Sequence, residues 1–172
     1  MYTIEEIKRI LIKSDFDEFK KALDDYDVHE RDKFGNTISH HYLNTLKDLK
    51  LDFKQVFDEL FERGIDIDDK QLKGPFKRSI LHMAAIQNNS DLFDYLLSKN
   101  PDVDSVDANG NNILITAVNQ YNKDVNIYGH YIKELLKRKA NPNLVNNHGY
   151  SVIAVVKDTS NSDVGKFFED KW

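Results

Sequence analysis

The stretch that decides the fold is Ser79–Leu97, which reads SILHMAAIQNNSDLFDYLL. A short apolar segment, Ile80–Ala85, is followed by the polar residues Gln87–Ser90 and then by leucines at positions 92, 96 and 97. Apolar residues recurring at this spacing give one apolar stripe on a short helix. The stretch therefore predicts two short helices joined by a tight turn.

Parts of the same pattern recur on both sides of this stretch. The unit before it begins DKFGNT at Asp32–Thr37 and ends VFDELFERGIDID at Val56–Asp68. The unit after it begins DANGNNIL at Asp107–Leu114 and ends LLKRKANPN at Leu135–Asn143, and a partial unit starts NNHGYSVI at Asn146–Ile153. One pair of short helices cannot bury its apolar stripe alone, so we expect the units to stack side by side.

The pattern resembles the ankyrin repeat, which has a period of 33 residues and a Thr-Pro-Leu-His-x-Ala core. In the middle unit Ser79 stands for the Thr and Ile80 for the Pro, while Leu81, His82 and Ala84 match directly. The resemblance implies an all-α helix-turn-helix solenoid with projecting turns and a role in protein binding. It departs from the family in lacking the Pro and in having longer units at residues 46–53, 72–77 and 121–131.

Both ends of the chain read as caps on the stack. Thr3 and Glu6 have the spacing of a capping box, and a short apolar face with charged neighbours falls at Val164–Phe168. We expect one ankyrin-repeat domain over residues 1–172. Its expected parts are an N-terminal helical cap (1–31), three repeats (32–68, 69–106 and 107–145) and a partial C-terminal capping repeat (146–172).

The composition narrows the function. The 172 residues include no cysteine and carry a formal net charge of −5. The missing cysteine excludes disulfides and thiolate chemistry and suits a reducing cytosol. We see no signal peptide and no apolar run long enough to span a membrane. Nucleic-acid binders show a basic stripe, so we expect that this acidic chain does not bind nucleic acid. From the missing signal peptide and membrane span we expect a cytoplasmic protein that does not bind a membrane.

No catalytic or metal motif stands out. His40 and His82 occupy the His position of the ankyrin pattern, where the ring fixes a turn by hydrogen bonds. Asp66–Asp69 resembles a magnesium cluster, but its spacing recurs at Asp102–Asp104 and Asn141–Asn143, which favours a repeated structural loop. The chain also lacks a Gly-x-Ser-x-Gly elbow and a phosphate-binding glycine loop. We expect no enzyme activity, no cofactor and no metal.

Two stretches carry unusual composition. Lys70–Arg78 gathers four cations in an acidic protein. Either its apolar residues Leu72 and Phe76 are exposed on a projecting turn, or Phe76 packs back onto the stack. Tyr121–Tyr131 is rich in Tyr, Asn and His, which suit a contact surface; the alternative, slightly favoured, is a helix extension whose tyrosines pack on neighbouring helices.

The resemblance also implies which residues meet a partner, because ankyrin-like stacks bind with their turns and with the exposed side of each first helix. Carried over by position, and with the two unusual stretches added, the predicted partner-binding residues are Lys33, Phe34, Asn36, Asn44, Lys73, Phe76, Lys77, Arg78, Gln87, Asn109, Asn111, Asn119, Gln120, Tyr121, His148 and Tyr150.

These observations predict a non-catalytic protein-binding module. A small acidic stack without an effector domain, rich in Lys, Asn, Asp and Ile, favours an immunity protein that binds and blocks a bacterial toxin domain. The negative charge favours a basic partner through electrostatic steering. We expect a monomer alone and a heterodimer with the partner. The alternative is an adaptor or secreted effector that recognises a host or cellular protein.

Overall fold

The structure is a computed structural model that describes residues 1–46, 49–158 and 163–171. These residues form helices and turns, with no β-strand among them beyond isolated bridges. The α-helices are α1 (Ile4–Lys13), α2 (Phe16–Leu23), α3 (Ile38–Thr45), α4 (Phe53–Glu62), α5 (Ile80–Ala84), α6 (Ser90–Ser98), α7 (Ile113–Gln120), α8 (Val125–Lys137) and α9 (Val152–Asp158). Short 3-10 helices are η2 (Tyr121–Lys123), η3 (Val164–Phe167) and η4 (Glu169–Lys171). The predicted all-α ankyrin-like fold is confirmed.

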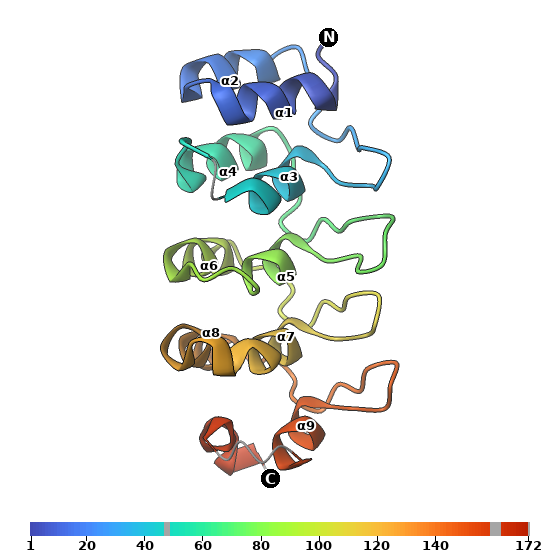
Figure 1. Cartoon of the computed structure of the whole chain (residues 1–172), viewed down its shortest axis with the longest axis vertical. Coiled ribbons are helices and arrows are strands. Elements are labelled where there is room, and N and C mark those ends of the chain that lie inside the picture. The colour runs from blue at the N-terminus through green and yellow to red at the C-terminus, as the bar shows by residue number, and fades with distance from the viewer. Residues whose placement is uncertain (47–48, 159–162, 172) are drawn as a thin grey trace. The chain divides into compact units, whose positions relative to one another are not determined.

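The chain divides into two compact units, Met1–Met83 and Ala84–Trp172. In the first unit α1 packs on α3 and α2 packs on α4, so that two helix pairs lie side by side (Figure 1). In the second unit the same relation holds between α6 and α8 and between α7 and α9. Each unit therefore buries its apolar stripes by pairing one helix hairpin with the next.

The N-terminal cap forms as its sequence predicts. Glu6 accepts a hydrogen bond from the backbone N–H of Thr3 at 2.8 Å and returns its own N–H to the Thr3 hydroxyl, which makes the capping box that starts α1. Asp15 caps α2 by accepting from the N–H of Glu18 at 2.9 Å. The inner faces of both helices are buried at Ile7 and Phe19.

Aromatic residues fill the space between the outer helices of the second unit. The ring of Tyr131 on α8 stacks on Phe93 of α6 with centroids 4.0 Å apart, and its hydroxyl donates to the carbonyl of Gln87 at 2.9 Å. Tyr128 and Tyr121 are also buried. The slightly favoured interpretation of the Tyr121–Tyr131 segment, a helix extension with packed tyrosines, is confirmed.

The turns between helix pairs extend away from the helices. Within each unit the two turns leave the same side and run next to each other, at residues 27–37 and 66–79 in the first unit and 102–112 and 141–151 in the second (Figure 1). We call these segments the fingers. Eleven of the sixteen predicted partner-binding residues lie on the fingers, and the other five lie on helices or between α5 and α6.

Candidate protein-binding surface

The first finger is closed by one aspartate. Asp32 Oδ1 accepts hydrogen bonds from the backbone N–H groups of Phe34 at 2.8 Å and Asn36 at 2.9 Å, and the Asn36 amide donates to Asp32 Oδ2 at 3.1 Å. Gly35 supplies the positive φ, +79°, that the turn requires. Burial would raise the pKa of Asp32, but the hydrogen bonds from Asn36 and Phe34 and the neighbouring His41 ring outweigh it and lower that pKa. The carboxylate therefore stays charged and holds the turn.

The same construction closes the other fingers. In each, the backbone N–H of the first turn residue donates to the carbonyl of the last, at 2.9 to 3.0 Å. The pairs are Asp32 and Asn36, Gln71 and Arg78, Asp107 and Asn111, and Asn146 and Tyr150. In each pair the first side chain also accepts from the N–H of the second. The second finger is wider because more residues lie between Gln71 and Arg78, and the longer glutamine spans that gap.

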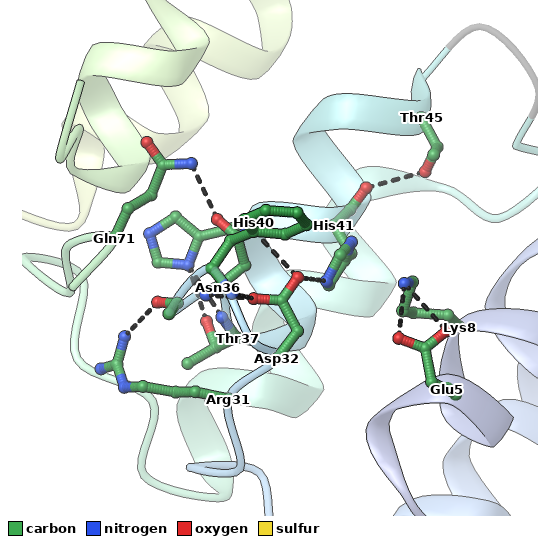
Figure 2. Close-up of polar contacts among 12 residues, drawn as sticks. Glu5, Lys8, Arg31, Asp32, Asn36, Thr37, His40, His41, Thr45 and Gln71 are labelled. Atoms are coloured by element: carbon green, nitrogen blue, oxygen red, sulfur yellow. Dashed lines mark hydrogen bonds and ion pairs between the residues drawn. The ribbon is translucent and has the colours of Figure 1, made fainter. Parts of the chain in front are cut away.

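Neighbouring fingers of the first unit are hydrogen-bonded to each other. Leu72 and Lys73 donate their backbone N–H groups to the carbonyls of Gly35 and Phe34, both at 3.2 Å. The Gln71 amide donates to Asn36 Oδ1 at 2.7 Å, as Figure 2 shows. A side chain at Gly35 would meet the Leu72 and Lys73 backbone at 2.8 Å, so the two fingers meet in direct contact.

A cation and a hydroxyl tie the base of these fingers to the helices. Arg31 donates to the carbonyls of Gly35 and Lys70, both at 2.9 Å, and forms an ion pair with Asp69. Thr37, which precedes α3, donates to the other oxygen of Asp69 at 3.2 Å. Arg31 and Thr37, at the two ends of the first finger, therefore hold it to the start of the second finger.

His40 acts inside this scaffold. Its Nδ1 lies 2.8 Å from the Thr37 hydroxyl and accepts from the Thr37 backbone N–H at 3.2 Å (Figure 2). Burial lowers the pKa of His40 to about 4, so the ring is neutral at neutral pH. His82 repeats the arrangement with the Ser79 hydroxyl at 2.8 Å. Both rings are fully buried, so neither can reach a partner or substrate.

The fingers of the second unit are joined in the same way. Asn147 donates its backbone N–H to the carbonyl of Asn109 at 2.9 Å and its amide to the carbonyl of Ala108 at 3.0 Å. Asn146 donates its amide to Asn111 Oδ1 at 2.8 Å, as Gln71 does to Asn36. Each unit therefore presents a pair of fingers braced by one side-chain amide contact.

The structure sorts the predicted partner-binding residues by exposure. Exposed in the first unit are Lys33, Phe34, Asn44, Lys73, Phe76 and Lys77, and in the second Asn119, His148 and Tyr150. Partly exposed are Arg78, Gln87, Asn109, Asn111 and Gln120.

Two members of the predicted set are buried. Asn36 spends its amide between Asp32 and Gln71, and Tyr121 is 2% exposed with its hydroxyl donating to Asp163 at 2.6 Å. A buried side chain cannot contact a partner, so we leave both residues out of the proposed surface.

The exposed apolar side chains of the first unit's fingers lie among cations. Phe34, Leu72 and Phe76 are 54%, 59% and 46% exposed. The Lys33 ammonium lies 5.0 Å from the centre of the Phe34 ring, and the Arg78 guanidinium lies 4.3 Å from that of Phe76. Phe76 is thus about half exposed with Arg78 over its ring, which favours the projecting turn over the alternative in which Phe76 packs back onto the stack.

Some features of the fingers were not identified from the sequence. Val106 and Val145 are exposed large apolar residues, and each directly precedes the first residue of its turn. The equivalence of Gln71 with Asp32 was also missed. Counting backwards from Thr37 and Ser79 does not reveal it, because Asp32 lies five residues before Thr37 and Gln71 lies eight residues before Ser79.

The aspartate pairs that resemble a metal site form one repeated turn. Asp66 accepts a hydrogen bond from the N–H of Asp68 at 2.9 Å. The same contact joins Asp102 to Asp104 at 3.0 Å and Asn141 to Asn143 at 2.9 Å. Within the part of the chain that the structure describes, no group of three or more His, Cys, Asp or Glu side chains is placed to hold a metal ion. Nor is any of its helices long and apolar enough to cross a membrane.

Comparison with known proteins agrees with this construction. A family model described as "Ankyrin repeats (3 copies)" matches residues 47–146 and 81–168. Comparison with curated proteins gives no match. The match covers more than half of the sequence and falls on the repeats whose turns and helix pairs are described above. The chain therefore belongs to the ankyrin repeat family, whose repeats indicate a protein–protein interaction module.

Proposed function

We propose that this protein is a non-catalytic binding protein that acts by covering a surface of another protein. The observation that carries the proposal is the construction of the fingers. In each finger the side chain of the first turn residue is used inside the turn, whereas large apolar side chains such as Phe34 and Tyr150 remain exposed. A braced turn loses little conformational entropy on binding, and exposed aromatic residues are the common anchors of protein interfaces.

The proposed contact residues are the exposed members of the predicted set. They lie on the fingers and on the first helix of each pair, and they are Lys33, Phe34, Asn44, Lys73, Phe76, Lys77, Asn119, His148 and Tyr150. The partly exposed residues Arg78, Gln87, Asn109, Asn111 and Gln120 form the rest of the proposed surface.

We propose further that the partner is a bacterial toxin domain and that this chain is its immunity protein. The acidic, lysine- and asparagine-rich composition supports this assignment by association. Inhibition then follows from steric occlusion, with no bond made or broken. A protein without cysteine suits a reducing compartment, so we place this function in the cytoplasm, with the chain monomeric until it meets its partner.

The test is a pull-down with the purified chain against the product of the neighbouring gene. The immunity proposal predicts one-to-one capture, loss of the toxin's activity on binding, and weaker capture by a Phe34→Ser, Tyr150→Ser variant. A Val125→Ser variant is the matched control, since Val125 is exposed but lies on α8. A neighbour without a toxin-like domain that fails to bind contradicts the immunity assignment. A gene that stands alone or beside secretion genes supports an adaptor or effector instead.

A further inference from the structure

The first unit carries a local charge opposite to that of the whole chain. Its fingers present Lys33, Lys73 and Lys77 as exposed cations around the apolar side chains of Phe34, Leu72 and Phe76. We call these six residues the basic finger patch. They lie together because Leu72 and Lys73 are hydrogen-bonded to the backbone of Gly35 and Phe34.

Two carboxylates of these fingers are engaged by groups other than the lysines of the patch. The Asp32 carboxylate accepts hydrogen bonds from the backbone N–H groups of Phe34 and Asn36, and its Oδ2 lies 3.0 Å from Nε2 of His41. Asp69 is occupied by Arg31 and Thr37 at the base of the fingers. Neither segment 33–46 nor segment 70–78 contains an acidic residue. The cations at the tips are therefore available to a negative partner.

The backbone of the patch is fixed in an uncommon conformation. Lys77 has a φ of +48°, in the left-handed region that favours glycine. Gln71 closes the turn around it through two hydrogen bonds with Arg78, at 3.0 and 3.1 Å. A strained conformation of this kind persists only where the surrounding structure holds it, and such residues cluster at ligand-binding positions.

We propose that the basic finger patch binds an acidic segment of a protein, in which carboxylates flank an aromatic or aliphatic side chain. The cations pair with the carboxylates, and the apolar side chain packs on Phe34, Leu72 and Phe76. This inference rests on the proposed protein-binding function and adds the chemistry of the partner segment.

The net charge of −5 does not oppose this proposal. At physiological ionic strength charges further apart than about 8 Å are largely screened, so a bound segment senses the local cations. A nucleic acid or an anionic membrane fits less well, because a chain with net negative charge lacks the long basic stripe that those polyanions require.

The experiment uses the full chain and a set of short fluorescein-labelled peptides of Asp and Glu with one central Phe, Leu, Trp or Val. Anisotropy measures affinity, and ¹⁵N-resolved NMR locates the contact. We expect binding by at least one acidic peptide, with shift changes concentrated at residues 33–36 and 70–78. Matched peptides with Asn and Gln in place of the acids should bind about tenfold more weakly or worse, because the charge pairs are lost.

Two charge-reversal variants separate the patch from bulk charge. Lys73→Glu with Lys77→Glu removes cations from the patch, and Lys50→Glu with Lys123→Glu makes the same change of net charge at exposed positions outside it. The first variant should weaken peptide binding about tenfold or more, and the second should leave it within about twofold. Far-UV circular dichroism confirms that both variants fold.

Several results would overturn the proposal. They are no binding by any acidic peptide, shift changes away from the patch, equal weakening by both variants, or binding of phosphatidylserine vesicles or RNA at the patch in place of the peptides. The proposed function is judged separately: a captured partner that binds the Lys73→Glu, Lys77→Glu variant as tightly as the original chain supports the function and refutes this inference.

Discussion

His40 lies buried at the start of α3, where Thr37 holds its Nδ1. Burial keeps the ring neutral by lowering its pKa to about 4 from an ordinary value of 6.5. Between pH 6.5 and about 4, His40 is therefore protonated in the unfolded chain and neutral in the folded chain. His41 contributes in the same direction, because burial and the nearby Lys8 lower its pKa as well.

This difference predicts that the fold loses stability as the pH falls below 6.5. Because the folded pKa lies below the unfolded one, the free energy of unfolding is fully retained above pH 6.5 and falls as the pH drops towards 4. We expect a loss of about 2 kcal/mol from His40 between pH 7.5 and 5. Urea unfolding followed by circular dichroism at both pH values measures it.

The control for this prediction is a pair of histidine variants. His40→Gln should flatten the dependence of stability on pH, whereas His148→Gln, at an exposed turn position, should leave it unchanged. A His40→Gln variant that loses as much stability on acidification as the original chain contradicts the assignment to His40.

His82 provides a second test at this scale. It is fully buried and hydrogen-bonded to Ser79, so His82→Ala leaves a cavity and removes the contact between the ring and the Ser79 hydroxyl. We expect a loss of roughly 2–4 kcal/mol in the free energy of unfolding. Partner binding by the fraction that remains folded should be unchanged. Loss of binding without loss of stability would indicate a direct role for the ring.

At the level of the elements, two glycines with similar backbone angles have different surroundings. Gly110 has a φ of +75°, and an added Cβ would lie 2.9 Å from the Asn147 backbone nitrogen. Gly149 has a φ of +83°, and nothing lies within 4 Å of its Cβ position. The first glycine is needed for both conformation and close approach, the second for conformation alone.

We therefore expect Gly149→Ala to cost about 1 kcal/mol, the typical price of a left-handed conformation. Gly110→Ala should cost more, by roughly 1–3 kcal/mol, because the finger that carries Asn147 must also move. Urea unfolding of the two variants gives the comparison. Equal losses in the free energy of unfolding would contradict the close approach of Gly110 to the Asn147 backbone.

The elements also show how far sequence reasoning reaches. Helical spacing and caps predicted α1, α2 and α6, because apolar residues such as Ile7 and Leu96 recur at fixed intervals along the chain. Sequence reasoning did not predict that Asn36 is buried, or that Gln71 takes the place in the second finger that Asp32 has in the first. Those facts depend on contacts between fingers that are about 35 residues apart in the sequence, which local periodicity does not encode.

The partner-binding surface was predictable only in part for the same reason. Family position identifies which residues lie on fingers, and Phe34 and Tyr150 are exposed as expected. Family position does not identify which finger side chains are buried by hydrogen bonds within or between the fingers. Tyr121 was included for its composition, but the Asp163 carboxylate and neighbouring rings bury it.

At the level of the whole molecule, the most extensive contacts join elements that are close in the sequence, such as α7 with α8 and α1 with α2. Chains with mainly local contacts fold fast, because little loop-closure entropy precedes the first stabilising contacts. Among residues 1–46, 49–158 and 163–171 all peptide bonds are trans, and the three prolines of the sequence can isomerise in the unfolded chain.

We predict that refolding from urea gives a main phase in the millisecond range and a minor phase of about 10–100 s from proline isomerisation. Stopped-flow circular dichroism at 222 nm follows the helices directly. Addition of a prolyl isomerase should accelerate only the minor phase. A dominant slow phase that the isomerase leaves unchanged would show that distant contacts limit folding.

The amide contacts between fingers have a direction, since in each unit the first finger offers a side-chain oxygen to the second. Asn36 and Asn111 make that offer to Gln71 and Asn146. The matching position of the last finger holds Tyr150, whose phenol has no amide oxygen to give. Tyr150→Asn would place such an oxygen at this position, and an engineer who wished to graft on another repeat would begin there.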